Sequence, residues 1–171
     1  RDSVLLDAVR RLVDEGHSVR LRHVGDGVDR PSLEDHARAL GLDDHVVFEG
    51  AVNQDHIRSL YARASAFCIP SFAEGIPVVL MEAMSMEIPC VTTRITGIPE
   101  LITDGVDGLL VPPSNTDALA AALARLIDDP ATAEAMGRRG RHVVQKHYEI
   151  IKNVDGLADV FDQRVGCQRS P

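Results

Sequence analysis

The chain has 171 residues, of which 44% are hydrophobic, and this is enough for one domain with its own hydrophobic core. A formal net charge of −8 argues against nucleic acid or an anionic membrane surface as the main partner, because both would repel the chain. The low aromatic content and the absence of Trp disfavour a base-stacking platform, and no apolar run reaches the roughly 20 residues of a membrane span.

Helix and strand patterns alternate along the chain. Apolar residues at helical spacing predict helices, and short apolar runs predict strands. The expected elements, in chain order, are a helix over 3–16, a strand over 18–25, a helix over 31–42, a strand over 45–50, a helix over 53–64, a strand over 66–71, a helix over 78–84, a strand over 88–93, a short turn over 97–102, a strand over 107–113, and helices over 115–129 and 129–148. Gly16 is expected to end the first helix, and Asn53 is a candidate cap for the third.

This alternation indicates an α/β fold with a doubly wound, Rossmann-like parallel sheet that is covered on both faces, because the strands are mostly apolar throughout. We expect residues 1–165 to form one domain and 166–171 to be a loose tail. Cys68 and Cys90 fall in apolar strand segments, so buried free thiols in a reducing compartment are expected. Cys167 lies in the tail. The seven histidines show no helical pair at metal-ligand spacing, so no metal site is predicted.

Glycine-containing segments follow four successive strands: 25–27 (GDG), 49–52 (EGAV), 71–77 (SFAEGIP) and 93–100 (TRITGIPE). In doubly wound sheets, ligands bind outside the carboxyl ends of the strands. Glycine allows a ligand to approach the backbone closely. A helix that starts near Pro77 would also offer free N–H groups and a positive dipole end, which favour phosphate. The sequence therefore predicts a ligand site at this edge.

Two glutamates stand out beside this edge. Glu82 interrupts the apolar helix over 78–84, and Glu74 precedes that helix. If the helix is buried, an unpaired Glu82 carboxylate would be costly. Helical side chains lean toward the N-terminus, so Glu82 would point to the mouth of the helix, where a diol such as a ribose could donate two hydrogen bonds. Alternatively, backbone or Ser/Thr groups donate to Glu82 and its role is structural, and Glu74 is an exposed loop acid.

The segments VGDG, VVFEGAV, PSFAEGIPVVLMEAM, IPCVTT, GIPELITDGVDGLLVPP and DALAAALARLIDDP follow one another in this order. Together with the two glutamates eight positions apart, they resemble the C-terminal, donor-binding domain of retaining GT-B glycosyltransferases of the nucleotide-sugar-dependent group 1 (family 4) type. The resemblance runs from residue 5 to about 160. The segment AMSMEIPCVTTRITGIPELI is most similar to exopolysaccharide or colanic-acid-type enzymes. Most relatives carry Gly at the position of Glu87.

The resemblance implies roles for both glutamates. Glu74 would be catalytic, since it would hydrogen-bond the donor sugar and stabilise an oxocarbenium-like transition state, and Glu82 would bind the ribose hydroxyls. Other residues would hold the sugar and diphosphate or border the diphosphate and base: Gly75, Ile76, Pro77, Val78, Val79, Gly25, Asp26, Gly27, Gly50 and Val52. The donor would be a UDP- or GDP-sugar, and no metal or other cofactor is expected.

The resemblance also implies partners beyond the donor. The acceptor would be a saccharide or a lipid-linked saccharide, held by a separate N-terminal domain, in the synthesis of exopolysaccharide or another cell-surface polysaccharide. In the family, a strand and a loop that carry a diphosphate-binding Arg and Lys precede the first helix. We therefore expect a fragment that lacks this strand and the acceptor domain and is inactive alone.

The full-length enzyme is expected in the cytoplasm, where peripheral association with the inner face of the membrane is compatible with its function, and no nucleic acid or transmembrane segment is expected. A non-catalytic nucleotide-binding or interaction module and a nucleotide-sugar epimerase of the same fold are the alternatives. The paired glutamates favour transfer over epimerisation.

Overall fold

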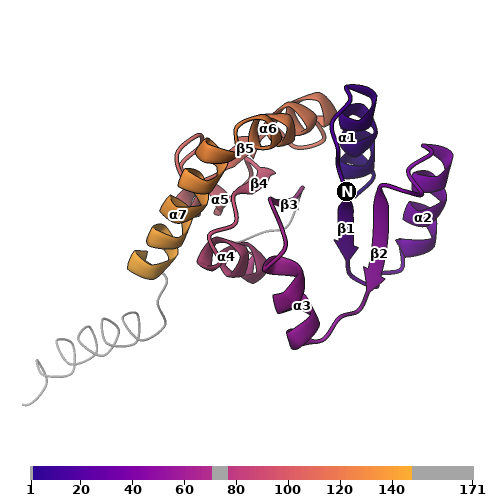
Figure 1. Ribbon diagram of the computed structural model, residues 1–171. Helices are drawn as coiled ribbons and strands as arrows, with labels where there is room; N and C mark the ends of the chain where they lie inside the picture. Colours follow the sequence, from indigo (N-terminus) through magenta and orange to yellow (C-terminus); the bar gives the residue numbers. More distant parts are fainter. Residues whose placement is uncertain (1, 71–76, 148–171) are drawn as a thin grey trace, which may run out of the picture.

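The computed structural model describes residues 2–70 and 77–147 (Figure 1). The helices are α1 (Asp2–Asp14), α2 (Arg30–Ala39), α3 (Gln54–Tyr61), α4 (Val78–Ser85), α5 (Ile98–Leu101), α6 (Thr116–Asp128) and α7 (Pro130–His147), and the strands are β1 (Leu21–Val24), β2 (Val46–Gly50), β3 (Phe67–Ile69), β4 (Cys90–Thr93) and β5 (Leu109–Val111). The predicted alternation is confirmed, except that the turn expected over 97–102 contains the short helix α5. Within the described ranges, no helix is long and apolar enough to cross a bilayer.

The described strands form two parallel sheets. One sheet has the order β1-β2 and the other has the order β3-β4-β5. Every pairing is parallel, as expected where a helix separates successive strands. Figure 1 places β3 between β4 and β1, yet no ladder joins β1 to β3 among the described residues. The doubly wound α/β class is confirmed, and in this part of the chain the parallel strands are divided between two sheets.

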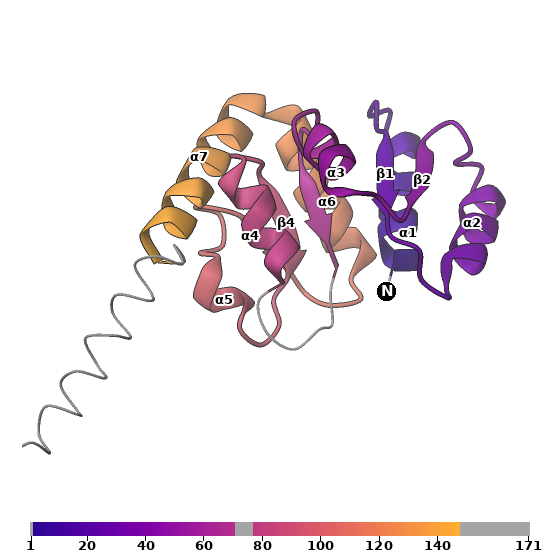
Figure 2. The same cartoon turned by 90° about the horizontal axis from the view of Figure 1, so that it is seen from below.

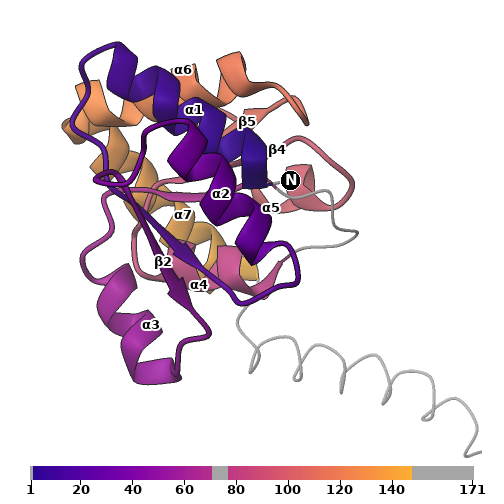
Figure 3. The same cartoon turned by 90° about the vertical axis from the view of Figure 1, so that its right-hand side faces the viewer.

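One hydrophobic core nevertheless extends across both sheets. Helix α1 contacts α2 on one side and α6 on the other, and Figures 2 and 3 show α1 beside both helices. The buried members of this core come from α1, α2, α6 and α7 and from strands of both sheets, among them Leu6, Val9, Leu12, Leu33, Val46, Val91, Leu109, Leu119 and Met136. Each fully buried side chain of this size stabilises the fold by about 1.5–3 kcal/mol.

The two sheets differ in how they are covered. All residues of β4 and β5 are buried, because a second core, formed largely by α4 and α5, covers the face opposite α1 and α6. In β1 and β2, by contrast, Arg22, Val24 and Val47 are exposed. The predicted coverage of both faces is therefore confirmed for the three-stranded sheet and wrong for the two-stranded one.

Three helices end with the same backbone motif. After α1, α2 and α4, the residue just beyond the cap has a positive φ: Gly16 (88°), Gly41 (66°) and Glu87 (60°). In each case the next residue donates its N–H to the carbonyl five positions back, as Ile88 does to Ala83 at 3.1 Å after α4, which is the Schellman arrangement. Gly16 thus ends α1 as predicted. A non-glycine residue in this conformation costs about 1–2 kcal/mol, which explains why Gly suits the position of Glu87.

Other local expectations can also be compared with the structure. The Asn53 side chain accepts a hydrogen bond from the His56 N–H at 2.8 Å, so the predicted cap of α3 is confirmed. Neither Cys68 nor Cys90 is in a disulfide, and the expected burial is confirmed for Cys90 but wrong for Cys68, which is half-buried. Phe67 pairs with Cys90 across the ladder and packs in the same core as Cys90, whereas Cys68 packs in the other core. The two thiols therefore lie on opposite faces of the sheet and cannot form a disulfide.

Candidate functional site

Glu82 lies on the exposed side of α4. The buried stripe of this helix consists of Leu80, Ala83 and Met84, which share one face at helical spacing. Glu82 and Val78 lie on the other side and are exposed to solvent. The expectation that the Glu82 carboxylate is buried is therefore wrong, because the apolar residues 78–84 do not all face the core. Water can therefore donate many of the hydrogen bonds that this carboxylate accepts, and its position does not by itself require a ligand.

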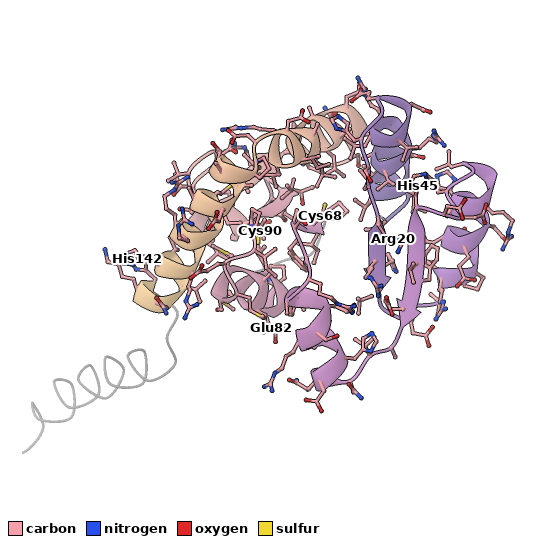
Figure 4. The ribbon with its side chains drawn as sticks, viewed as in Figure 1. Arg20, His45, Cys68, Glu82, Cys90 and His142 are labelled. Atoms are coloured by element: carbon pink, nitrogen blue, oxygen red, sulfur yellow. The ribbon has the colours of Figure 1, made fainter. Side chains whose placement is uncertain are left out.

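A tyrosine that the sequence analysis missed contacts Glu82. The Tyr61 hydroxyl lies 3.3 Å from Glu82 Oε2 and 3.4 Å from the carbonyl oxygen of Val79. Figure 4 shows Glu82 at the boundary between α4 and α3. Burial, together with the charge of Glu82, raises the pKa of Tyr61 to about 12. The Tyr61 hydroxyl thus lies between the Glu82 carboxylate and the backbone carbonyl of Val79, about one turn earlier in α4.

The start of α4 has no side-chain cap among the described residues. Its N-cap residue is Pro77, which makes no capping hydrogen bond, whereas side-chain oxygens cap α3, α6 and α7. Leu80 donates its N–H to the Pro77 carbonyl at 3.1 Å, and among the described residues no acceptor contacts the N–H groups of Val78 and Val79. These two N–H groups and the helix dipole are suited to an anion.

Three of the predicted residues lie outside the described ranges. They are Glu74, Gly75 and Ile76. Their predicted roles, including the catalytic role of Glu74, stay predictions.

The glycine turns after β1 and β2 are joined to each other. The Gly25 N–H donates to the Gly50 carbonyl at 3.0 Å. Both residues have positive φ, 140° for Gly25 and 70° for Gly50, so a side chain would be strained at either position. A Cβ built on Gly25 or Gly27 would meet nothing within 4 Å. The backbone of this turn is thus open to a ligand.

Arg30 is a second residue that the sequence analysis missed. Its Nε lies 2.7 Å from Glu34, and its Nη1 lies 3.3 Å from Asp26. The same Nη1 would be 2.7 Å from a Cβ at Gly50, so the guanidinium covers the Gly50 backbone. Arg30 therefore holds the turn over 25–27 against the end of β2. The carboxylates of Glu34 and Asp26 already neutralise the positive charge of the Arg30 guanidinium.

The structure brings the predicted residues together in two groups. Gly25, Asp26 and Gly50 form one group beside Arg30, and Val78, Val79 and Glu82 form the other beside Tyr61. Helix α3 runs from one group to the other, since it begins two residues after Val52 and ends at Tyr61. In the described ranges, no cluster of three or more His, Cys, Asp or Glu side chains is suited to hold a metal.

The chain is similar to known glycosyltransferases. The sequence model for "Glycosyl transferases group 1" matches residues 3–143. The chain is 32% identical over 156 residues to the alpha-D-kanosaminyltransferase of Streptomyces kanamyceticus, covering 91% of this chain and 40% of that protein. It is 35% identical over 152 residues to the putative colanic acid biosynthesis glycosyltransferase WcaL of Salmonella typhimurium, covering 85% and 37%.

A solved structure agrees with this similarity. The sucrose-phosphate synthase of Thermosynechococcus elongatus has a TM-score of 0.83 and 25% identity, covering 95% of this chain and 43% of that one. The chain thus spans well under half the length of each of these three proteins.

Proposed function

Because the chain belongs to the glycosyl transferases group 1 family and has the GT-B fold, we propose that it binds the nucleotide-sugar donor of a retaining glycosyltransferase. The observation that carries this proposal is the arrangement at α4. The Glu82 carboxylate is exposed and held by Tyr61, beside a helix start that no described side chain caps.

Each part of a nucleotide-sugar has a matching feature in the proposed site. A carboxylate accepts up to four hydrogen bonds, so Glu82 can accept from both hydroxyls of a ribose. The uncapped N–H groups of Val78 and Val79 are suited to the diphosphate. The open turn over 25–27 allows the base to approach the backbone. Since these contacts come from protein groups alone, the proposed site uses no metal.

Chemistry at the donor sugar is proposed from the resemblance. Glu74 would stabilise the positive charge that develops on the sugar as the bond to the diphosphate breaks. The leaving phosphate would take the proton of the acceptor hydroxyl, which attacks on the same face, so that configuration is retained. We propose a UDP- or GDP-sugar as the donor, a saccharide or lipid-linked saccharide as the acceptor, and cell-surface polysaccharide synthesis in the cytoplasm as the setting.

We also propose that one further strand completes the sheet between β1 and β3. The split between two parallel sheets that share one core supports this proposal. A strand in that place, leading into α1, would reach β1 by the right-handed crossover that parallel sheets favour. The resemblance implies that this strand, its loop with a phosphate-binding Arg and Lys, and an acceptor domain belong to the same protein.

Replacing Glu82 tests the proposed donor site. In the full-length protein, Glu82→Gln should weaken UDP or GDP binding about tenfold, the scale of one charge-assisted hydrogen bond. Stability should hardly change, because the Glu82 side chain is exposed. Isothermal titration calorimetry gives the affinity, and thermal melting gives the stability.

The matched control is Glu87→Gln, which removes an exposed glutamate just beyond the other end of α4 and should leave nucleotide affinity unchanged. A 2′,3′-dideoxy nucleotide should bind wild type and Glu82→Gln equally. Unchanged affinity of Glu82→Gln for the ribonucleotide would contradict the assignment of the ribose to Glu82.

A further inference from the structure

Tyr61 is fixed in place before any ligand binds. It lies at the end of α3 with only 8% of its surface exposed. Its ring contacts that of Phe67 on β3, with the centroids 6.0 Å apart and the planes tilted by 58°. It also belongs to the core that contains Leu80 of α4. This packing leaves the hydroxyl group little freedom to move.

The hydroxyl of Tyr61 is shared by two acceptors on α4. The distances to Glu82 Oε2 (3.3 Å) and to the Val79 carbonyl (3.4 Å) are long for O–H···O bonds, as expected when one proton serves two oxygens. Among the described residues, no hydrogen-bond donor contacts Glu82 Oε1. The carboxylate is thus tethered through one oxygen while the other stays available.

We infer that Tyr61 is a positioning residue, which holds the Glu82 carboxylate at the start of α4 in the orientation that accepts the ribose hydroxyls. This inference rests on the proposed donor-binding function. An exposed glutamate samples many rotamers, and immobilising it when a ligand binds costs affinity. The contact from Tyr61 restricts these rotamers in advance. Because the pKa of Tyr61 is raised to about 12, its hydroxyl stays protonated and remains a donor throughout the neutral range.

The test removes one hydroxyl group and keeps the ring. In the full-length protein, Tyr61→Phe should weaken UDP binding about threefold to tenfold, the range of one hydrogen bond. The variant should bind 2′,3′-dideoxy-UDP as tightly as wild type does, because that ligand lacks the hydroxyls that Glu82 would bind. A merely structural role would weaken both ligands alike. Ser85→Ala is the control, since it removes a hydroxyl group of α4 that donates to the Met81 carbonyl at 2.7 Å. That hydroxyl group is not hydrogen-bonded to Tyr61 or Glu82, so its loss should change neither affinity.

The double variant Tyr61→Phe/Glu82→Gln separates this inference from the proposed function. If Tyr61 acts through Glu82, the double variant should bind UDP no more weakly than Glu82→Gln alone, so the two effects should not add. Additive losses, or a Tyr61→Phe variant that binds UDP like wild type while Glu82→Gln binds weakly, would overturn the role of Tyr61 and leave the proposed function intact. If Glu82→Gln binds UDP like wild type, the assignment of the ribose to Glu82 fails, and the role of Tyr61 fails with it.

Discussion

Gly137→Ala is expected to destabilise the fold by about 3 kcal/mol, which corresponds to roughly 10 °C in melting temperature for a chain of this length. Gly137 lies on the buried face of α7. A Cβ there would lie 1.9 Å from the carbonyl oxygen of Glu87 and 2.7 Å from its carbonyl carbon. Both are backbone atoms at the end of α4, so a side-chain rotation cannot relieve the clash, and α7 must move away from α4.

The neighbouring glycine provides the control. A Cβ at Gly140, on the same helix, would lie 3.1 Å from the Asp107 carbonyl oxygen and 3.4 Å from Met84 Cε, which small shifts can accommodate. Alanine favours the helix by about 1 kcal/mol over glycine, so Gly140→Ala should change the free energy of unfolding by no more than about this amount. Denaturant unfolding of both variants checks the difference. Equal stability of the two variants would contradict the close packing of α4 on α7.

Glu74→Ala is expected to reduce kcat of the full-length enzyme by at least about 10²-fold, the usual loss when one group that stabilises transition-state charge is removed. The affinity for UDP or GDP should be nearly unchanged, because the charge develops on the sugar only during the reaction. This prediction rests on the resemblance, since Glu74 lies outside the described residues. Steady-state transfer assays, together with nucleotide titrations, measure both quantities.

Glu87→Ala serves as the control for the loss of a negative charge. Glu87 is exposed and lies 3.3 Å from Arg141, at the end of α4 far from Pro77, so kcat should stay close to that of wild type. If Glu74→Ala transfers sugar at the wild-type rate, Glu74 has no catalytic role.

Local sequence signals account for much of the fold. The apolar periodicity predicted every described helix and strand except α5 to within a few residues, because buried residues recur at regular spacing, as Leu80, Ala83 and Met84 do in α4. Glycine with positive φ and the Asn53 cap were also predictable, since they depend on neighbouring residues only. The division into two sheets was not predictable, because strand pairing depends on segments far apart in the chain.

The candidate site was predicted less completely. Glu82 stood out in the sequence, but its predicted burial was wrong. Almost all residues of 78–84 are apolar, so the sequence does not indicate which side of the helix faces the core. Tyr61 and Arg30 were missed for a different reason. Their importance comes from contacts with Glu82, 21 residues away in the chain, and with the backbone at Gly50. No local pattern marks such contacts.

Backbone-amide NMR of the 171-residue chain, titrated with UDP and GDP, tests most directly whether this domain binds the donor nucleotide at the carboxyl edge of its strands. We predict chemical-shift changes at Gly25, Gly27, Val79 and Glu82. Affinity should be weak, approaching millimolar, because each phosphate contact supplied by another part of the protein would add about 1.5–3 kcal/mol. Shift changes confined to the opposite edge of the sheets, or none at saturating nucleotide, would contradict the account.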